Sequence, residues 1–147
     1  MLLLRQCLLN TYLVRLRAIA DFWQVELTAS KQREVALQLE AAMADPAAIA
    51  RAYQALTEQQ RQALRALLTS DGQMPQRVYA RNWGEIRMMG PGRMDREKPW
   101  TEPTSPAEGL WYRGFLFRSF EQGPDGAYEA VFIPPEIRAH LRVPDGE

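Results

Sequence analysis

The stretch that decides the fold is TSPAEGLWYRGFLFRSFEQGPDGAYEAVFI, from Thr104 to Ile133. It opens with the signals of a helix start. Ser105 is a natural N-cap, and Pro106 follows at the first helical position, where its missing N–H has no cost. Glu108, at the third position, can complete a capping box. These signals predict a helix over residues 106–115.

After this helix the apolar spacing changes from a period of about 3.6 residues to a period of 2, which indicates a strand. The residues GPDG, from Gly123 to Gly126, form a turn cluster, and the alternating pattern resumes from Tyr128 to Ile133. The sequence therefore predicts a β-hairpin over about residues 115–133. A helix followed by a strand, a turn and a strand forms the second half of a winged helix.

The preceding residues predict the first half. Thr57 with Gln60 is another capping-box signature, and helices are expected over residues 58–69 and 76–83 with a very short strand at Gln73 and Met74. The predicted fold class is mainly α with a small β-hairpin, that is, α+β. In this prediction a helical N-terminal pair (1–44) packs on a winged-helix-like domain (45–147), which has a long loop before its third helix. The final VPDGE, residues 143–147, is typical of a linker.

Composition narrows the class of protein. The chain has 147 residues and one cysteine, Cys7, so no internal disulfide can form, and a reducing cytoplasmic setting is expected. The opening MLLLRQCLLN is interrupted by Arg5 and Gln6 and lacks the features of a signal peptide. No run approaches the ~20 apolar residues that span a membrane, so no membrane association is expected.

Residues Asn10 to about Ala44 resemble the SAP motif, a helix-linker-helix element that binds DNA. The resemblance lies in the order Leu13, Leu16, Ile19, Trp23, Val25, Lys31, Arg33, Glu34, Val35 and Leu39. It implies DNA contact by Lys31 and Arg33. The chain departs from the motif where Ala29 and Ser30 replace the expected glycine. The alternative is a helical hairpin that packs on the rest of the chain, with Ser30 capping its second helix.

The loop over residues 84–104, GEIRMMGPGRMDREKPWTEPT, is unusually long, because a helix-turn-helix normally uses about 3 or 4 residues here. Such loops are usually functional or disordered. Apolar anchors favour order and predict that the loop wraps over the domain; they are Ile86, Met88, Met89, Met94 and Trp100. Gly90, Pro91 and Gly92 predict a tight turn that presents Arg93.

The runs WGEIRMMGPGRMDREKPW and SPAEGLWYRG also resemble uncharacterised bacterial proteins described as helicase-associated, or repair-helicase-like, winged-helix regions. The resemblance covers Leu56 to Leu141. It implies an accessory piece of a larger DNA-processing protein or complex, without a motor of its own.

The first function hypothesis is nucleic-acid binding, with DNA as the expected partner. The net charge of zero weakens it, because duplex-binding modules usually have a stronger basic bias, but the uneven distribution of charge leaves room for a local contact through the central segment. Residues 76–100 have a net charge of +3, whereas residues 101–147 have a net charge of −4. The acidic hairpin would repel phosphate, so the basic loop is the expected contact. The candidate phosphate-binding and base-stacking residues are Arg77, Arg81, Arg87, Arg93, Arg96, Lys98 and Trp100.

The alternative function is a protein-docking module. Methionine and aromatic side chains adapt to partner surfaces, and the candidates are Trp83, Trp100, Met88, Met89 and Met94. These side chains could equally be ordinary core.

An enzymatic function is not expected. His140 is the only histidine and Cys7 the only cysteine, so their number excludes zinc sites with several Cys or His ligands and excludes His-containing triads. No phosphate-cradling glycine motif is present, because GPGR has too few glycines. We therefore expect no cofactor and no metal.

Overall fold

The computed structural model describes residues 2–141, and within them it contains nine helices and three strands. The helices are α1 (Leu4–Leu9), α2 (Leu13–Phe22), α3 (Gln32–Met43), α4 (Pro46–Ala55), α5 (Glu58–Leu68), α6 (Gln76–Trp83), α7 (Pro91–Glu97), α8 (Pro106–Tyr112) and α9 (Pro135–Arg138). The strands are β1 (Gln73–Pro75), β2 (Phe117–Gly123) and β3 (Gly126–Phe132). The predicted linker VPDGE lies outside the described residues.

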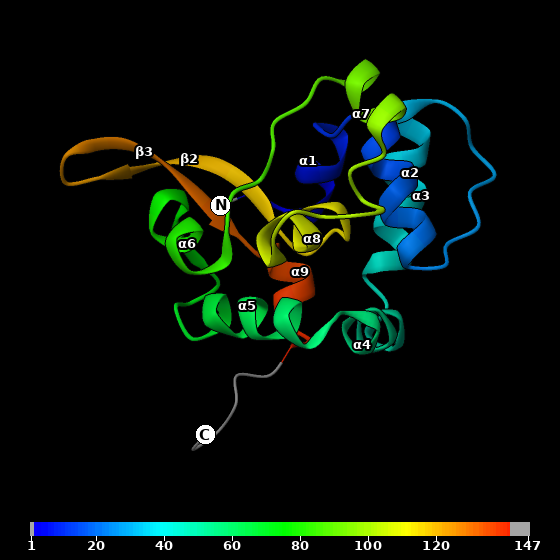
Figure 1. Ribbon diagram of the computed structural model, residues 1–147. Coiled ribbons are helices and arrows are strands. Elements are labelled where there is room, and N and C mark those ends of the chain that lie inside the picture. Colours follow the sequence, from blue (N-terminus) through cyan, green and yellow to red (C-terminus); the bar gives the residue numbers. More distant parts are fainter. Residues whose placement is uncertain (1, 142–147) are drawn as a thin grey trace.

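The predicted fold class is confirmed: the chain is mainly helical with a small antiparallel sheet of order β1-β3-β2. The elements α5, β1, α6, α8, β2 and β3 follow in the predicted order. Met74 of β1 and Arg118 of β2 both lie opposite Val131 of β3. The hairpin projects away from the helices, and β2 lies at the edge of the sheet (Figure 1).

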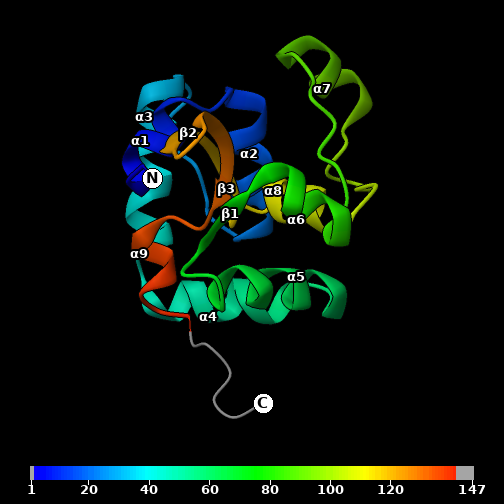
Figure 2. The same ribbon diagram turned by 90° about the vertical axis from the view of Figure 1, so that its left-hand side faces the viewer.

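The N-terminal helices pack on this part of the chain through one continuous core. Helix α3 contacts α1 and α2, and α2 also contacts α8 (Figures 1 and 2). Trp23 stacks on Phe115 with ring centroids 5.3 Å apart, and its indole N–H donates to the carbonyl of Arg113 at 2.6 Å. Gly114 has a φ of +79°, and a Cβ there would lie 2.8 Å from Ile19, so glycine is required at this junction.

Most predicted helix starts are confirmed. The Thr57 and Gln60 capping box forms, and the Ser105 hydroxyl accepts from the backbone N–H of Glu108 at 3.1 Å. Two details were wrong. Helix α3 begins after Lys31 rather than Ser30, and no side chain caps it. The Glu108 carboxylate does not complete a capping box, because it turns instead toward Thr104 and Arg87.

The predicted tight turn at Gly90 to Gly92 is also wrong. Gly90 is an N-cap and Pro91 opens helix α7, which packs on α2 and buries Met94. The expectation that the loop wraps over the domain is confirmed by this packing. None of the helices within residues 2–141 combines the length and the apolar composition that a membrane span requires.

Candidate binding site

Arg87 is committed to an ion pair inside the protein. Its guanidinium donates to Glu108, with 2.8 Å between Nη2 and Oε1, and its backbone N–H donates to Oε2 of the same carboxylate. Burial alone would raise the pKa of Glu108, but the hydrogen bonds from Arg87 and Thr104 outweigh it and hold the pKa below its ordinary value. Arg87 therefore anchors the loop and is poorly placed to bind phosphate.

The cations of α7 have local partners as well. Arg93 forms an ion pair with Glu97, one turn along the helix. Lys98 donates to the carbonyl of Asp95 and lies 5.9 Å from the ring centroid of Trp100. Trp100 itself is half-buried against Tyr112, so it is not an open stacking face. Arg96 is exposed and, in residues 2–141, forms no ion pair, although its charge acts on Glu97.

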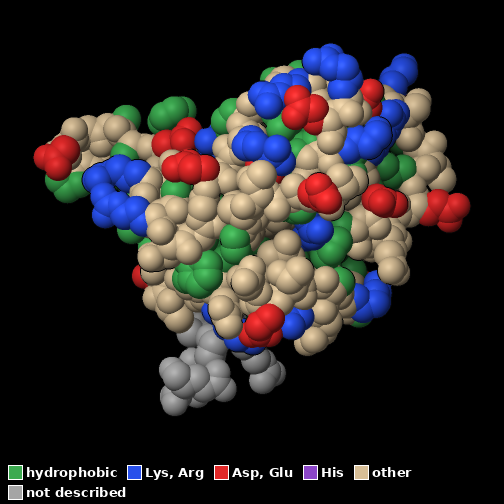
Figure 3. Space-filling view, in the orientation of Figure 1, with side chains coloured by type: hydrophobic (Ala, Val, Ile, Leu, Met, Phe, Trp, Pro, Cys, Tyr) green, Lys and Arg blue, Asp and Glu red, His purple; other side chains and the backbone are tan. Residues whose placement is uncertain are grey.

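The remaining candidate cations lie on other elements. Arg77 and Arg81 are exposed on α6, which lies well apart from α7 in both ribbon views (Figures 1 and 2). Lys31 and Arg33 are exposed at the start of α3. Figure 3 shows basic groups over the upper end of the molecule and beside the hairpin, with acidic groups among them. The structure does not gather the predicted residues into one basic patch.

Helix α8 occupies the position at which a winged helix usually reads DNA, yet here it is largely buried. Five of its seven residues are buried, and it packs between α5, α6 and α2. A helix covered in this way cannot enter a groove.

Arg15 is a buried cation that sequence reasoning missed. It is 5 % exposed, its Nε and Nη2 donate to the carbonyl of Trp111, and Nη2 also donates to the carbonyl of Leu116 at 2.9 Å. Its guanidinium lies 3.5 Å from the ring centroid of Trp111. The sequence did contain a signal for its burial: Arg15 lies four residues before Ile19, which places both on the inner face of α2.

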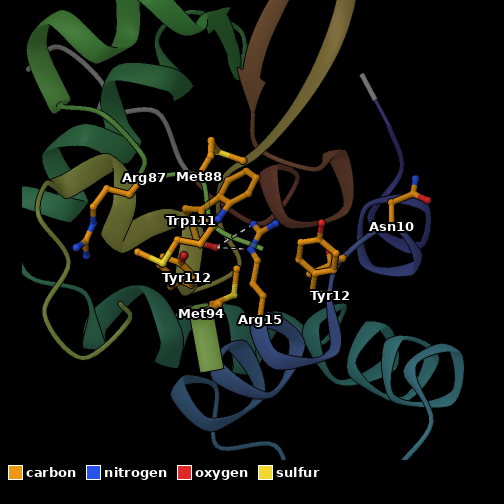
Figure 4. Close-up of a pocket in the computed structure, with 10 residues that line it drawn as sticks. Asn10, Tyr12, Arg15, Arg87, Met88, Met94, Trp111 and Tyr112 are labelled. Atoms are coloured by element: carbon orange, nitrogen blue, oxygen red, sulfur yellow. Dashed lines mark hydrogen bonds between the residues drawn. The ribbon is translucent and has the colours of Figure 1, made fainter. Parts of the chain in front are cut away.

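Arg15 lines a cavity of about 270 Å³ between α2, the loop and α8, here named the Arg15 pocket. Most of its wall is sulfur and aromatic surface, from Met88, Met89, Met94, Trp111, Tyr112 and Tyr12. Figure 4 shows the Arg15 guanidinium in the middle of this group, whereas the side chain of Arg87 points away. An apolar pocket with a few polar groups is typical of a binding site.

Three exposed side chains, Tyr12, Met88 and Phe120, are defined here as the apolar patch. These side chains are 52 %, 55 % and 75 % exposed. Tyr12 and Met88 line the pocket, and the sulfur of Met88 lies 2.6 Å from Nη2 of Arg118. Because residues alternate along a strand, Phe120 lies on the same face of β2 as Arg118.

The residues predicted for docking divide into two groups. Met89 and Met94 are buried and form a small core with Tyr112, against which Trp100 packs. Trp83 is half-buried against the main core. Met88 alone of the five is exposed. Phe120 and Tyr12 were not predicted.

No protein-family model, curated protein or solved structure matches this chain. The resemblances to the SAP motif and to helicase-associated regions therefore remain predictions.

Proposed function

We propose that this chain is a protein-docking module whose binding surface is the apolar patch beside the Arg15 pocket. The observation that carries the proposal is the position of Tyr12, Met88 and Phe120. They are three of the four exposed large hydrophobic side chains among residues 2–141. Tyr12 and Met88 line the same pocket, and Phe120 lies on the face of β2 that carries Arg118, which contacts Met88. Exposed apolar side chains that gather in this way mark interaction sites.

The surroundings of the patch favour a protein segment as the occupant. Met88 is flexible and polarisable, so it adapts to a partner's side chains. Two guanidinium groups lie near the Trp111 ring, with Arg15 at 3.5 Å and Arg118 at 5.2 Å from its centroid. Aromatic, methionine and arginine side chains are the residues enriched at protein interfaces. The hairpin projects from the helices (Figure 1), and Phe120 on its strand β2 is 75 % exposed.

The double variant Met88→Asp with Phe120→Asp should abolish docking without unfolding the protein. Peptides are first selected from a displayed random library on the wild-type protein, and their affinities are then measured by fluorescence polarisation. Two charges on the patch should weaken binding at least about tenfold. Because both side chains are exposed, the free energy of unfolding should change by only about 0.5 kcal/mol.

Ala41→Asp with Ala47→Asp is the matched control, because it adds the same two charges at exposed positions of α3 and α4. It should leave peptide binding unchanged. Selected peptides that bind the double variant and the wild type equally, or a library that yields no binder, would overturn the docking proposal.

Nucleic-acid binding is the second candidate, supported by the exposed cations of residues 76–100 that form no ion pair within residues 2–141. They are Arg77, Arg81, Arg96 and Lys98. Against it, Arg77 shares a groove with Asp125 of the hairpin turn. Labelled single- and double-stranded DNA should be titrated at low and high salt. Charge reversal at Arg77 and Arg81 should reduce the salt slope by about 1 for each phosphate that the variant no longer neutralises, and absence of binding at low salt would end this candidate.

A further inference from the structure

The interior of the Arg15 pocket holds a cation without a counter-ion. Arg15 satisfies two carbonyl groups with Nε and Nη2, whereas its Nη1 makes no hydrogen bond within residues 2–141. Tyr112, Cys7 and Arg118 are the charges that influence the pKa of Arg15, and Tyr12 and Arg87 also line the pocket; none of these groups is a carboxylate. A buried guanidinium normally has an acidic partner, so this one is electrostatically incomplete.

Tyr112 supplies a second incomplete group in the same pocket. The residue is 1 % exposed, and its hydroxyl is the one buried side-chain oxygen or nitrogen in residues 2–141 that has no hydrogen-bond partner. Buried tyrosine hydroxyls usually find a partner. Figure 4 places this hydroxyl within the same group of side chains as the Arg15 guanidinium.

One chemical group would satisfy both. A carboxylate accepts charge-assisted hydrogen bonds from a guanidinium and can accept a further bond from a phenolic hydroxyl. The methionine and tryptophan walls would suit an apolar neighbour of that carboxylate. A phosphate is larger and carries more charge, and the sulfur and aromatic side chains that form most of the wall would offer its other oxygens few donors.

We propose that the Arg15 pocket receives the carboxylate of an Asp or Glu side chain of the docked protein segment, while an apolar neighbour in that segment covers Met88 and Phe120. This inference rests on the proposed docking function. It identifies the partner as an acidic and apolar segment, and it identifies Arg15 and Tyr112 as the residues that select it.

The protonation states suit this role. Burial lowers the pKa of Arg15 to about 9, so the guanidinium is still charged at neutral pH. Burial and the nearby Glu108 raise the pKa of Tyr112, so its hydroxyl keeps its proton and can donate. Burial also raises the pKa of Cys7 to about 12, so the thiol does not act as a counter-ion.

Tyr112→Phe separates recognition from structure. The change removes a hydroxyl that has no partner in residues 2–141, so the variant should be at least as stable as the wild type. The probes are selected peptides, N-acetylated and C-amidated, each made with the acidic residue and with its amide counterpart. The acidic form should bind the wild type about tenfold more tightly than the amide form, and Tyr112→Phe should shrink this preference.

The outcomes are distinguishable. Binding that requires Met88 but shows no preference for the acidic form would overturn the carboxylate assignment and leave docking in place. Binding that ignores both Met88 and Phe120 would overturn docking itself. A third probe pair is 3-phenylpropionate and its amide: if the free acid binds as tightly as the peptides and Met88→Asp with Phe120→Asp does not weaken it, the pocket takes a small molecule rather than a protein segment.

Discussion

Glu108→Ala should lower the free energy of unfolding by about 3 kcal/mol, because it breaks a buried ion pair and leaves several donors without a partner. The Glu108 side chain is completely buried and accepts from the Arg87 guanidinium, from the Arg87 backbone and from the Thr104 backbone at 3.0 Å. The guanidinium of Arg87 is partly exposed and can turn to water, which keeps the loss at the lower end of the usual range. Denaturant unfolding monitored by circular dichroism measures it.

Glu108→Gln tests the contribution of charge through its pH dependence. The pKa of Glu108 is depressed in the folded protein, so its charge stabilises the fold above the ordinary carboxyl pKa, and this contribution is lost as the pH falls through the folded-state value. The stability difference between wild type and Glu108→Gln should therefore shrink below about pH 4.5. Glu97→Gln removes an exposed pair and should have little effect at any pH. A constant difference for Glu108→Gln would contradict this account.

The elements that the sequence predicted are those with local causes. Thr57 and Gln60 lie three residues apart, and the side chain of each accepts a hydrogen bond from the backbone N–H of the other. Ser105 likewise accepts from a backbone N–H in the first turn of the helix that it caps. The hairpin was predictable from the alternation of apolar and polar residues in its strands and from the glycine-rich turn between them, which ends at Gly126 with a φ of +109°. Each of these features depends on a few neighbouring residues, so no tertiary information was needed.

Helix α7 could not be predicted from local cues. Gly90, Pro91 and Gly92 are typical of a turn, and a short helix that contains a glycine has little intrinsic stability. Tertiary packing decides the outcome, because Met94 is buried beside Met89 and Tyr112. The prediction that Glu108 completes a capping box failed for a similar reason. Arg87, which is distant in sequence, offers the carboxylate charge-assisted hydrogen bonds, and these replace a bond to the local backbone N–H.

The candidate site was the least predictable part. Counting charges in residues 76–100 treated every arginine as available, but Arg87 and Arg93 are paired with acids. Which cations are paired depends on contacts between distant segments, as in the pair of Arg87 with Glu108. Arg15 was overlooked because an arginine among apolar residues is usually assumed to reach water. Met88 was predicted as an apolar anchor of the loop, which is wrong, because its side chain is 55 % exposed. Its exposure follows from the path of the loop rather than from its own residue type.

Trp23→Ala should destabilise the whole protein by about 3 to 5 kcal/mol and should do so in one cooperative transition. The side chain is 5 % exposed, stacks on Phe115 and donates a hydrogen bond to the carbonyl of Arg113. Truncation would leave a cavity and an unpaired carbonyl next to Gly114, where α2 and α3 meet the start of the sheet.

Trp23→Phe separates the contribution of packing from that of the hydrogen bond, because it keeps an aromatic ring against Phe115 and loses only the indole donor. It should lower the free energy of unfolding by about 1 kcal/mol, plus a small loss from poorer packing. Unfolding followed by far-ultraviolet circular dichroism and by tryptophan fluorescence should give coincident curves for the wild type and both variants. If residues 1–44 formed an independent DNA-binding unit, Trp23→Ala would instead melt the N-terminal helices alone, and the two probes would report separate transitions. The continuous core that joins Leu39, Met43 and Ile19 to Phe115 and Leu116 argues for the single transition, since removing one face of that core exposes the other.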